Sequence, residues 1–129
     1  MPLTTIIFYA ESDGKSPVVD WLSDLKLKNR QGFANCIARI RQLQQTGHQL
    51  RRPSSDYLRD GIYELRARHQ KVQYRILYFF NGKDIAVLNH SIINKTSAVP
   101  NKDLDIAIKR KKLFENNPQQ HTYQEDISE

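Results

Sequence analysis

The chain has 129 residues, a formal net charge of +6 and 39% hydrophobic residues. This length suits one domain with a core of modest size. A single cysteine, Cys36, excludes an internal disulfide and a metal site built on several cysteines. The sequence shows no secretory leader pattern, and its apolar runs are far shorter than the ~20 residues that span a bilayer. We therefore expect a cytoplasmic protein without a membrane partner.

The positive charge lies in the first 117 residues. The last stretch, residues 116–129, contains three acidic side chains and no Lys or Arg, which leaves residues 1–117 with 20 basic and 11 acidic side chains. Because the chain from Pro118 onward lacks apolar periodicity, we expect one domain over residues 1–117 and a disordered acidic tail over residues 118–129. The resulting net charge of +9 over residues 1–117 suits nucleic acid, the ribosome or an acidic protein as partner. A basic soluble protein without such a partner is the alternative.

The first half of the chain predicts a strand followed by two helices. Residues 4–9 are β-branched and aromatic, which is typical of a strand. Ser16 and Pro17 form a helix start, and a second helix is predicted over residues 29–46, with Gly47 closing it. Apolar residues recur at helical spacing and predict a helical hairpin that covers a sheet. They are Val18, Trp21, Leu22, Leu25, Phe33, Ile37, Ile40 and Leu43.

The second half predicts a polar loop over residues 48–56 and three strand-like segments over residues 58–68, 72–80 and 85–96. The pair Asn81-Gly82 is a hairpin signal. A last helix is predicted over residues 102–116, with a solvated basic run over residues 109–112. Its inward residues are Leu104, Ala107, Ile108 and Phe114. The order β-α-α-β-β-β-α is an α+β fold, with a small, mostly antiparallel sheet and the helical hairpin on one face.

Each of the three segments places a cation among apolar residues. Alternation puts Glu64 and Arg66 on the face that points away from the helical hairpin. Arg75 lies in a strand that is apolar on both faces, so it must either pair with an acid such as Glu64 or open onto a groove. Alternation places His90 with the even-numbered residues of its strand. It is either a core histidine or, because Lys95 follows closely, a functional one.

The set Arg66, Arg75, Lys95 and His90 fits neither a metal site nor a serine or cysteine triad. It fits cleavage of RNA, which needs a deprotonated 2′-hydroxyl, a stabilised phosphate and a protonated leaving oxygen. Arginine suits phosphate, and lysine or histidine can transfer protons, so the reaction requires no metal or other cofactor. Further cations around the strands are predicted to bind RNA: Arg51, Arg52, Arg68 and Lys71.

Several pieces of the sequence resemble the RelE/ParE superfamily, in particular its HigB-type, phage-derived branch. The most specific pieces are Gly61-Ile62-Tyr63-Glu64-Leu65-Arg66, Tyr74-Arg75-Ile76-Leu77-Tyr78 and Asn94-Lys95-Thr96. The match extends over about residues 4–115. The resemblance implies a RelE-like fold and the toxin of a type II toxin–antitoxin pair. Such a toxin enters the ribosomal A site and cleaves the exposed mRNA, and a small helix-turn-helix antitoxin neutralises it.

The resemblance also implies roles for individual residues. Arg66 and Arg75 match the two strand arginines that hold phosphate, and Lys95 matches the second lysine of the branch's ending. Asn94 stands in place of the first lysine and Ile92 in place of the usual aromatic, which leaves one cation fewer at the site. Two alternatives stay open. One is a non-enzymatic toxin of the ParE type that acts on DNA gyrase, and the other is a basic RNA- or ribosome-binding module without catalysis.

Overall fold

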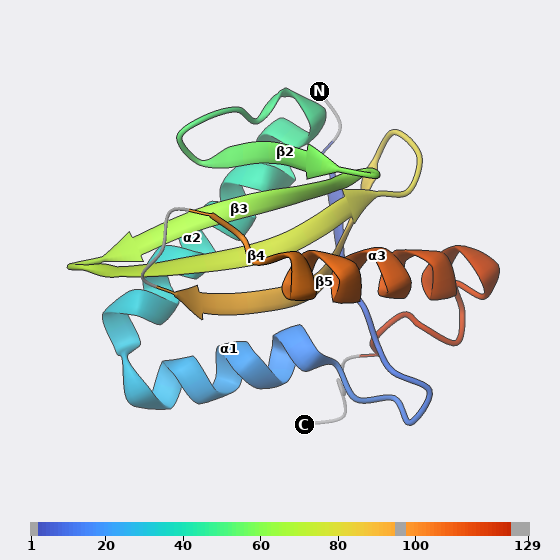
Figure 1. Ribbon diagram of the computed structural model, residues 1–129, viewed down its shortest axis with the longest axis horizontal. Helices are drawn as coiled ribbons and strands as arrows, with labels where there is room; N and C mark the ends of the chain where they lie inside the picture. The colour runs from blue at the N-terminus through green and yellow to red at the C-terminus, as the bar shows by residue number, and fades with distance from the viewer. Residues whose placement is uncertain (1–2, 95–97, 125–129) are drawn as a thin grey trace.

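The computed structural model describes residues 3–94 and 98–124. The elements in chain order are β1 (Thr5–Phe8), α1 (Pro17–Lys28), α2 (Arg30–Thr46), the 3-10 turn η1 (Gly47–Gln49), β2 (Ser55–Arg59), β3 (Ile62–His69), β4 (Val72–Phe80), β5 (Ile85–Asn94) and α3 (Asn101–Asn116). Figure 1 shows one sheet with α2 behind it and α3 in front of it. The predicted α+β class is confirmed.

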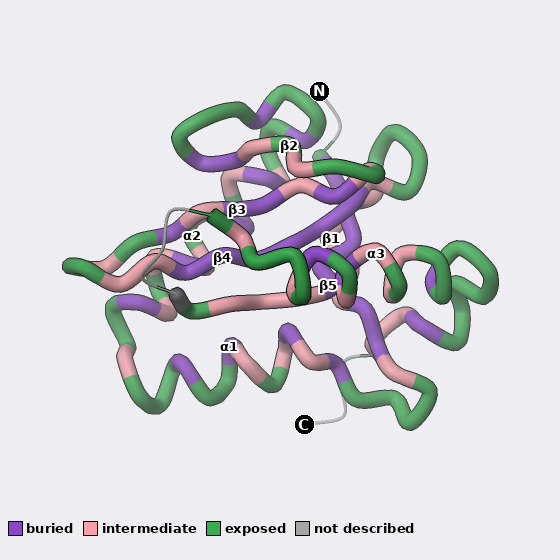
Figure 2. The backbone as a smooth tube through the Cα atoms, viewed as in Figure 1, coloured by how far each residue is buried: buried purple, intermediate pink, exposed green. Residues whose placement is uncertain are grey.

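The strands form a five-stranded sheet in the order β1-β5-β4-β3-β2. β1 pairs with β5 in parallel, and the other neighbours are antiparallel, so the predicted mostly antiparallel sheet is confirmed. β1 and β2 are the two edge strands. β4 lies in the centre and is buried along most of its length, as the purple tube in Figure 2 shows.

The two faces of the sheet support separate cores. α1 and α2 cover one face, where Val18, Leu43 and Leu88 are fully buried. α3 covers the other face, where its Phe114 packs edge-to-face against Phe79 of β4. The predicted helix faces are confirmed at their centres, whereas Trp21, Phe33, Ile37 and Ile108 are only half-buried. At the β2 edge of the sheet, Tyr57 and Arg59 are exposed.

The first helix begins at its predicted capping signal, and α2 begins at a cap that the sequence analysis did not name. The Ser16 hydroxyl accepts a hydrogen bond from the backbone N–H of Val19 at 3.3 Å, and Pro17 occupies the first position of α1. Asn29 caps α2 through its side-chain oxygen, which accepts from Gly32 at 2.9 Å. These local hydrogen bonds satisfy backbone donors that have no partner within the helix, which fixes where each helix begins.

Residues 58–68 are not one strand, as the sequence had suggested, but parts of two. The chain turns at Asp60-Gly61, where both residues have positive φ angles, 53° and 82°. This is the backbone of a two-residue hairpin turn, for which Asp-Gly is a preferred pair. The turn brings β3 back alongside β2, which becomes a fifth strand at the edge of the sheet. The sequence predicts part of this strand as a polar loop.

Residues 118–124 lie against the start of the chain, so the expectation of a tail without structure does not describe them. His121 is buried, stacks on Tyr9 with a centroid distance of 5.2 Å, and accepts a backbone hydrogen bond from Ala10 through its carbonyl oxygen. The N–H of Tyr123 donates to the carbonyl oxygen of Phe8. Residues 125–129 lie outside the described residues, and the division of the chain at residue 117 stays a prediction.

Candidate functional site

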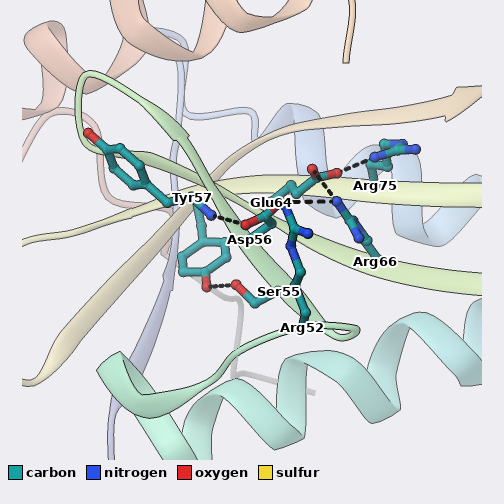
Figure 3. A network of polar contacts seen from close by, with 8 residues as sticks. Arg52, Ser55, Asp56, Tyr57, Glu64, Arg66 and Arg75 are labelled. Atoms are coloured by element: carbon teal, nitrogen blue, oxygen red, sulfur yellow. Dashed lines mark hydrogen bonds and ion pairs between the residues drawn. The ribbon is translucent and has the colours of Figure 1, made fainter. Parts of the chain in front are cut away.

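A continuous chain of ion pairs runs across β2, β3 and β4 on the face opposite the helical hairpin (Figure 3). We call it the arginine–carboxylate chain, and its members are Arg52, Asp56, Arg66, Glu64 and Arg75. Arg52 Nη2 lies 2.8 Å from Asp56 Oδ2, which also accepts from Arg66 Nη2 at 3.2 Å. The same Arg66 nitrogen lies 3.2 Å from Glu64 Oε2, and Glu64 Oε1 accepts from Arg75 Nη1.

Strand register places four of these five side chains together, and Arg52 joins them from the loop before β2. Asp56 pairs with Glu64 across the β2–β3 ladder, and Arg66 pairs with Arg75 across the β3–β4 ladder. Directly paired residues and residues two apart on one strand share a face, so the two carboxylates and these two arginines must point the same way. The predicted common face of Glu64 and Arg66 agrees with this geometry. Arg75 pairs with the acid that the sequence had named.

Burial increases along the arginine–carboxylate chain. The side chain of Arg52 is 74% exposed and that of Arg66 is 30% exposed, whereas Glu64 and Arg75 are almost completely buried. The hydrogen bond that Arg52 donates to Asp56 lowers the pKa of Asp56. The same hydrogen bond raises the pKa of Arg52. The outer end can therefore exchange partners with solvent or a ligand, while the inner Glu64–Arg75 pair is fixed by the low polarity around it.

The cations on this face are largely compensated by acids. Three guanidinium groups meet two carboxylates, which leaves a formal charge of +1 for the five residues. The buried Nε of Arg66 has no hydrogen-bond partner within the described residues, so its carboxylates do not satisfy the whole guanidinium. Arg66 thus combines a partly exposed side chain with one buried donor that has no partner within the described residues.

His90 lies on the Arg75 face, contrary to the strict alternation that the sequence suggested. A bulge at Asn89 shifts the register, because Tyr78 pairs with Leu88 whereas Leu77 pairs with His90. An extra residue in one strand turns the following side chains to the other face. The bulge also lets the Asn89 amide donate to the carbonyl oxygen of Ala107 in α3 at 2.9 Å.

Both ring nitrogens of His90 contact residues of α3. Nε2 lies 2.8 Å from Asp103 Oδ1, and Nδ1 lies 3.1 Å from Arg110 Nη1. A guanidinium can only donate, so Nδ1 accepts and the proton of the neutral ring resides on Nε2. Arg110 also lies 3.3 Å from Glu11, which shows that the basic run of α3 is not simply solvated. In this geometry His90 anchors α3 to β5.

His90 should make stability depend on pH. Burial lowers the pKa of His90, and the hydrogen bond that Nε2 donates to Asp103 opposes this shift. His90 therefore takes up a proton more readily in the unfolded chain than in the native protein. The contribution of His90 to the free energy of unfolding is complete above the ordinary histidine pKa of about 6.5. It is lost progressively as the pH falls below that value toward the lower pKa of the native protein. We expect the free energy of unfolding, measured by urea titration, to decrease from pH ~7.5 to ~5.5, and to decrease less in His90→Gln. Equal pH dependence of the two proteins would contradict this account.

The structure brings only some of the other predicted residues to this site. Arg52 joins the arginine–carboxylate chain directly, and Arg51 is held nearby by the carbonyl oxygens of His48 and Leu50. Arg68 and Lys71 lie beyond it, around the β3–β4 turn, where Arg68 Nε donates to the carbonyl oxygen of Gln70 at 2.8 Å. Lys95 lies outside the described residues, so its predicted role stays a prediction.

Sequence reasoning missed Asp56, which it placed at the end of a polar loop, and named Glu64 only as a partner for Arg75. The Asp60-Gly61 turn signals the hairpin, but a regular two-residue hairpin would place Asp56 opposite Leu65. The register shift between Tyr57 and Arg59 moves Asp56 opposite Glu64, and no signal in the sequence marks that shift.

Two further observations concern the described part of the chain as a whole. Across residues 3–94 and 98–124, no group of three or more His, Cys, Asp or Glu side chains is arranged to hold a metal ion. None of the helices in that part of the chain has the length and apolar character needed to cross a membrane.

Comparison with known proteins assigns the chain to a family. No curated protein matches the sequence significantly. The model of the phage-derived Gp49-like protein family (DUF891), a family of the RelE toxin type, matches residues 20–112, which is more than half of the chain and contains all five members of the arginine–carboxylate chain. The α+β architecture around a mostly antiparallel sheet agrees with a RelE-like fold. The chain therefore belongs to the phage-derived Gp49-like family.

Proposed function

We propose that the protein is the toxin of a type II toxin–antitoxin pair, of the HigB-type branch, and that it arrests translation by cutting mRNA in the ribosomal A site. The observation that carries the proposal is Arg66, a partly exposed arginine in a preorganised ion-pair chain, within a family of the RelE type. The proposed reaction needs no metal and takes place where ribosomes translate, in the cytoplasm. The proposed protein partner is a helix-turn-helix antitoxin.

The arginine–carboxylate chain suits phosphate binding because the ion pairs at its exposed end exchange more easily than the buried pair at its inner end. Solvent-accessible ion pairs contribute only about 0–1 kcal/mol, so a phosphate can displace Asp56 from Arg52 and Arg66 at little cost. The buried Glu64–Arg75 pair does not exchange in this way and keeps Arg66 oriented through Glu64. A guanidinium held in place before the reaction stabilises developing charge on the phosphate more effectively than a mobile one.

Proton transfer requires a residue other than the arginines that bind phosphate. Lys95 is the proposed proton carrier on the strength of the resemblance. His90 is held by Asp103 and Arg110, so acting on RNA would require it to leave α3. This observation, together with the carboxylates on Arg66 and Arg75, favours a second candidate function, in which the protein binds RNA or the ribosome without cleaving RNA.

The proposal is tested by expressing the protein and mapping cuts on a translated mRNA by primer extension, alongside bacterial growth. We expect Arg66→Ala to reduce cleavage by about 10²–10³-fold, because it removes a preorganised charge from the transition state. Arg59→Ala is the matched control. It removes the same charge from an exposed arginine that pairs with Asp60 and Asp105, away from the arginine–carboxylate chain, and should cut normally.

The outcomes separate the candidate functions. If Arg66→Ala stays folded and cuts at the wild-type rate, this face is not the nuclease site. Growth arrest with blocked translation but without cuts would support the binding-only function. Inhibited DNA supercoiling with translation intact would instead support a toxin that acts on DNA gyrase.

A further inference from the structure

A cleft of about 670 Å³ opens beside the edge strand β2, next to the arginine–carboxylate chain. Its walls combine aromatic rings with cations, from Tyr57, Tyr63, His48, Arg51 and Arg52. Its volume falls within the range of small-molecule sites. The proposed cleavage does not use the aromatic residues of this cleft, so their presence there requires another explanation.

Tyr57 is an exposed ring held in a fixed position. The residue is 52% exposed although it lies in a strand. Its ring contacts Tyr63 edge-to-face at a centroid distance of 5.0 Å, and its hydroxyl accepts a hydrogen bond from the Gly61 N–H at 3.0 Å. A tyrosine that served only the core would be covered. A rigid and open aromatic ring can instead stack on a flat ligand with little further loss of conformational freedom.

The rings behind Tyr57 make the wall of the cleft stable. Tyr63 stacks on Tyr78 at 5.4 Å and meets Phe80 edge-to-face at 5.3 Å, and His48 stacks on Phe80 at 3.6 Å. This aromatic row runs from the core of the helical-hairpin face out to Tyr57 at the surface. The cleft is therefore anchored to the core and does not depend on a loop alone.

Charge decides what kind of flat ligand fits. Arg51 and Arg52 are exposed at the cleft, and Asp56 is the acid that lines it with them. Asp56 Oδ2 is shared between Arg52 at the cleft and Arg66 in the arginine–carboxylate chain, so an anion at Arg52 would lie next to the proposed phosphate site. Aromatic rings interleaved with arginines are typical of sites for single-stranded nucleic acid.

We propose that this cleft holds one unstacked base of single-stranded RNA on Tyr57, with a flanking phosphate at Arg51 and Arg52. The inference rests on the proposed function in taking RNA as the ligand, and it adds a second contact site on the same strand of RNA. The base must leave its stack to reach Tyr57, so duplex RNA is excluded. Every base offers a π-face, so recognition tolerates different sequences.

The experiment measures binding of a short fluorescein-labelled oligouridine by anisotropy, without ribosomes. Tyr57→Ala should weaken binding by about 5- to 150-fold, whereas Tyr57→Phe, which keeps the ring, should stay within about twofold of the wild type. Leu27→Ala is the control for loss of an exposed apolar side chain elsewhere, since Leu27 is 88% exposed on α1. It should bind normally, and annealed duplex RNA should bind weakly to every protein.

Abasic sites in the oligonucleotide give an independent arm that does not depend on the folding of a variant. One abasic position should weaken binding to the wild-type protein as much as Tyr57→Ala does, and should cause no further loss in Tyr57→Ala. Equal binding by Tyr57→Ala and the wild type, or additive losses, would overturn the inference. If oligonucleotide binding depends on the Tyr57 ring but the protein does not cut mRNA, only the proposed nuclease activity is refuted. If the protein cuts mRNA but Tyr57→Ala binds the oligonucleotide normally, only the proposed base-binding role of this cleft is refuted.

Discussion

Glu64→Ala is expected to lower the free energy of unfolding by about 3–5 kcal/mol, the largest single effect on the arginine–carboxylate chain. Glu64 is buried and accepts from both Arg66 and Arg75, and Arg75 is itself 3% exposed. Removing the carboxylate takes the counter-charge of Glu64 away from the buried guanidinium of Arg75, and this part of the cost of desolvating the guanidinium is then no longer offset. Urea unfolding followed by circular dichroism measures the loss.

Two control variants isolate this effect. Asp56→Ala removes a carboxylate from the more exposed part of the same chain and should cost no more than about 1 kcal/mol. The double variant Glu64→Leu, Arg75→Met should recover most of the lost stability, because apolar residues of similar size replace the pair. A loss below about 1 kcal/mol in Glu64→Ala would show that the inner pair does not stabilise the sheet.

Leu43→Ala is expected to cost about 2–5 kcal/mol of unfolding free energy. Leu43 lies near the end of α2 and is fully buried in the core between the helical hairpin and the sheet. Truncation removes apolar contacts and leaves a cavity that the close-packed neighbours cannot fill. The thermal midpoint and the urea midpoint should both decrease.

Leu27→Ala and Ile37→Ala provide the comparison for Leu43→Ala. Leu27 is exposed on α1 and its truncation should change stability by no more than about 0.5 kcal/mol. Ile37 is half-buried on α2, one side of the buried stripe, and its truncation should cost less than that of Leu43. If Ile37→Ala and Leu43→Ala cost the same, the orientation of α2 on the sheet differs from the one described above.

The arginine–carboxylate chain contributes both to the stability of the fold and to the proposed binding of RNA. The inner pair stabilises β3 against β4, and the outer Asp56 can release Arg52 and Arg66 to a ligand. Loss of Glu64 should therefore unfold the protein or disorient Arg66, whereas loss of Asp56 should leave the fold intact and expose more positive charge. Variants at the two acids thus distinguish folding from RNA binding.

The sequence by itself determined the helices, the central strands and the common face of Glu64 and Arg66 on β3. Helix starts at Ser16 and Asn29 follow from hydrogen bonds within a few residues, and the pattern of buried residues on α2 follows from helical periodicity. For Arg75 the sequence left two possibilities, pairing with an acid such as Glu64 or opening onto a groove, because a buried charge requires one or the other. The structure shows the pair with Glu64. These features depend on neighbours in sequence or on an energetic requirement that holds in any fold.

Only the tertiary structure decided the rest. The bulge at Asn89 moved His90 to the Arg75 face, and Asp56 became a member of the site only through its register with Glu64. The docking of His121 on Tyr9 joins residues from opposite ends of the chain. Such features depend on strand register and on contacts between distant segments. Alternation along a single strand carries no information about them, because one inserted residue reverses every later side chain.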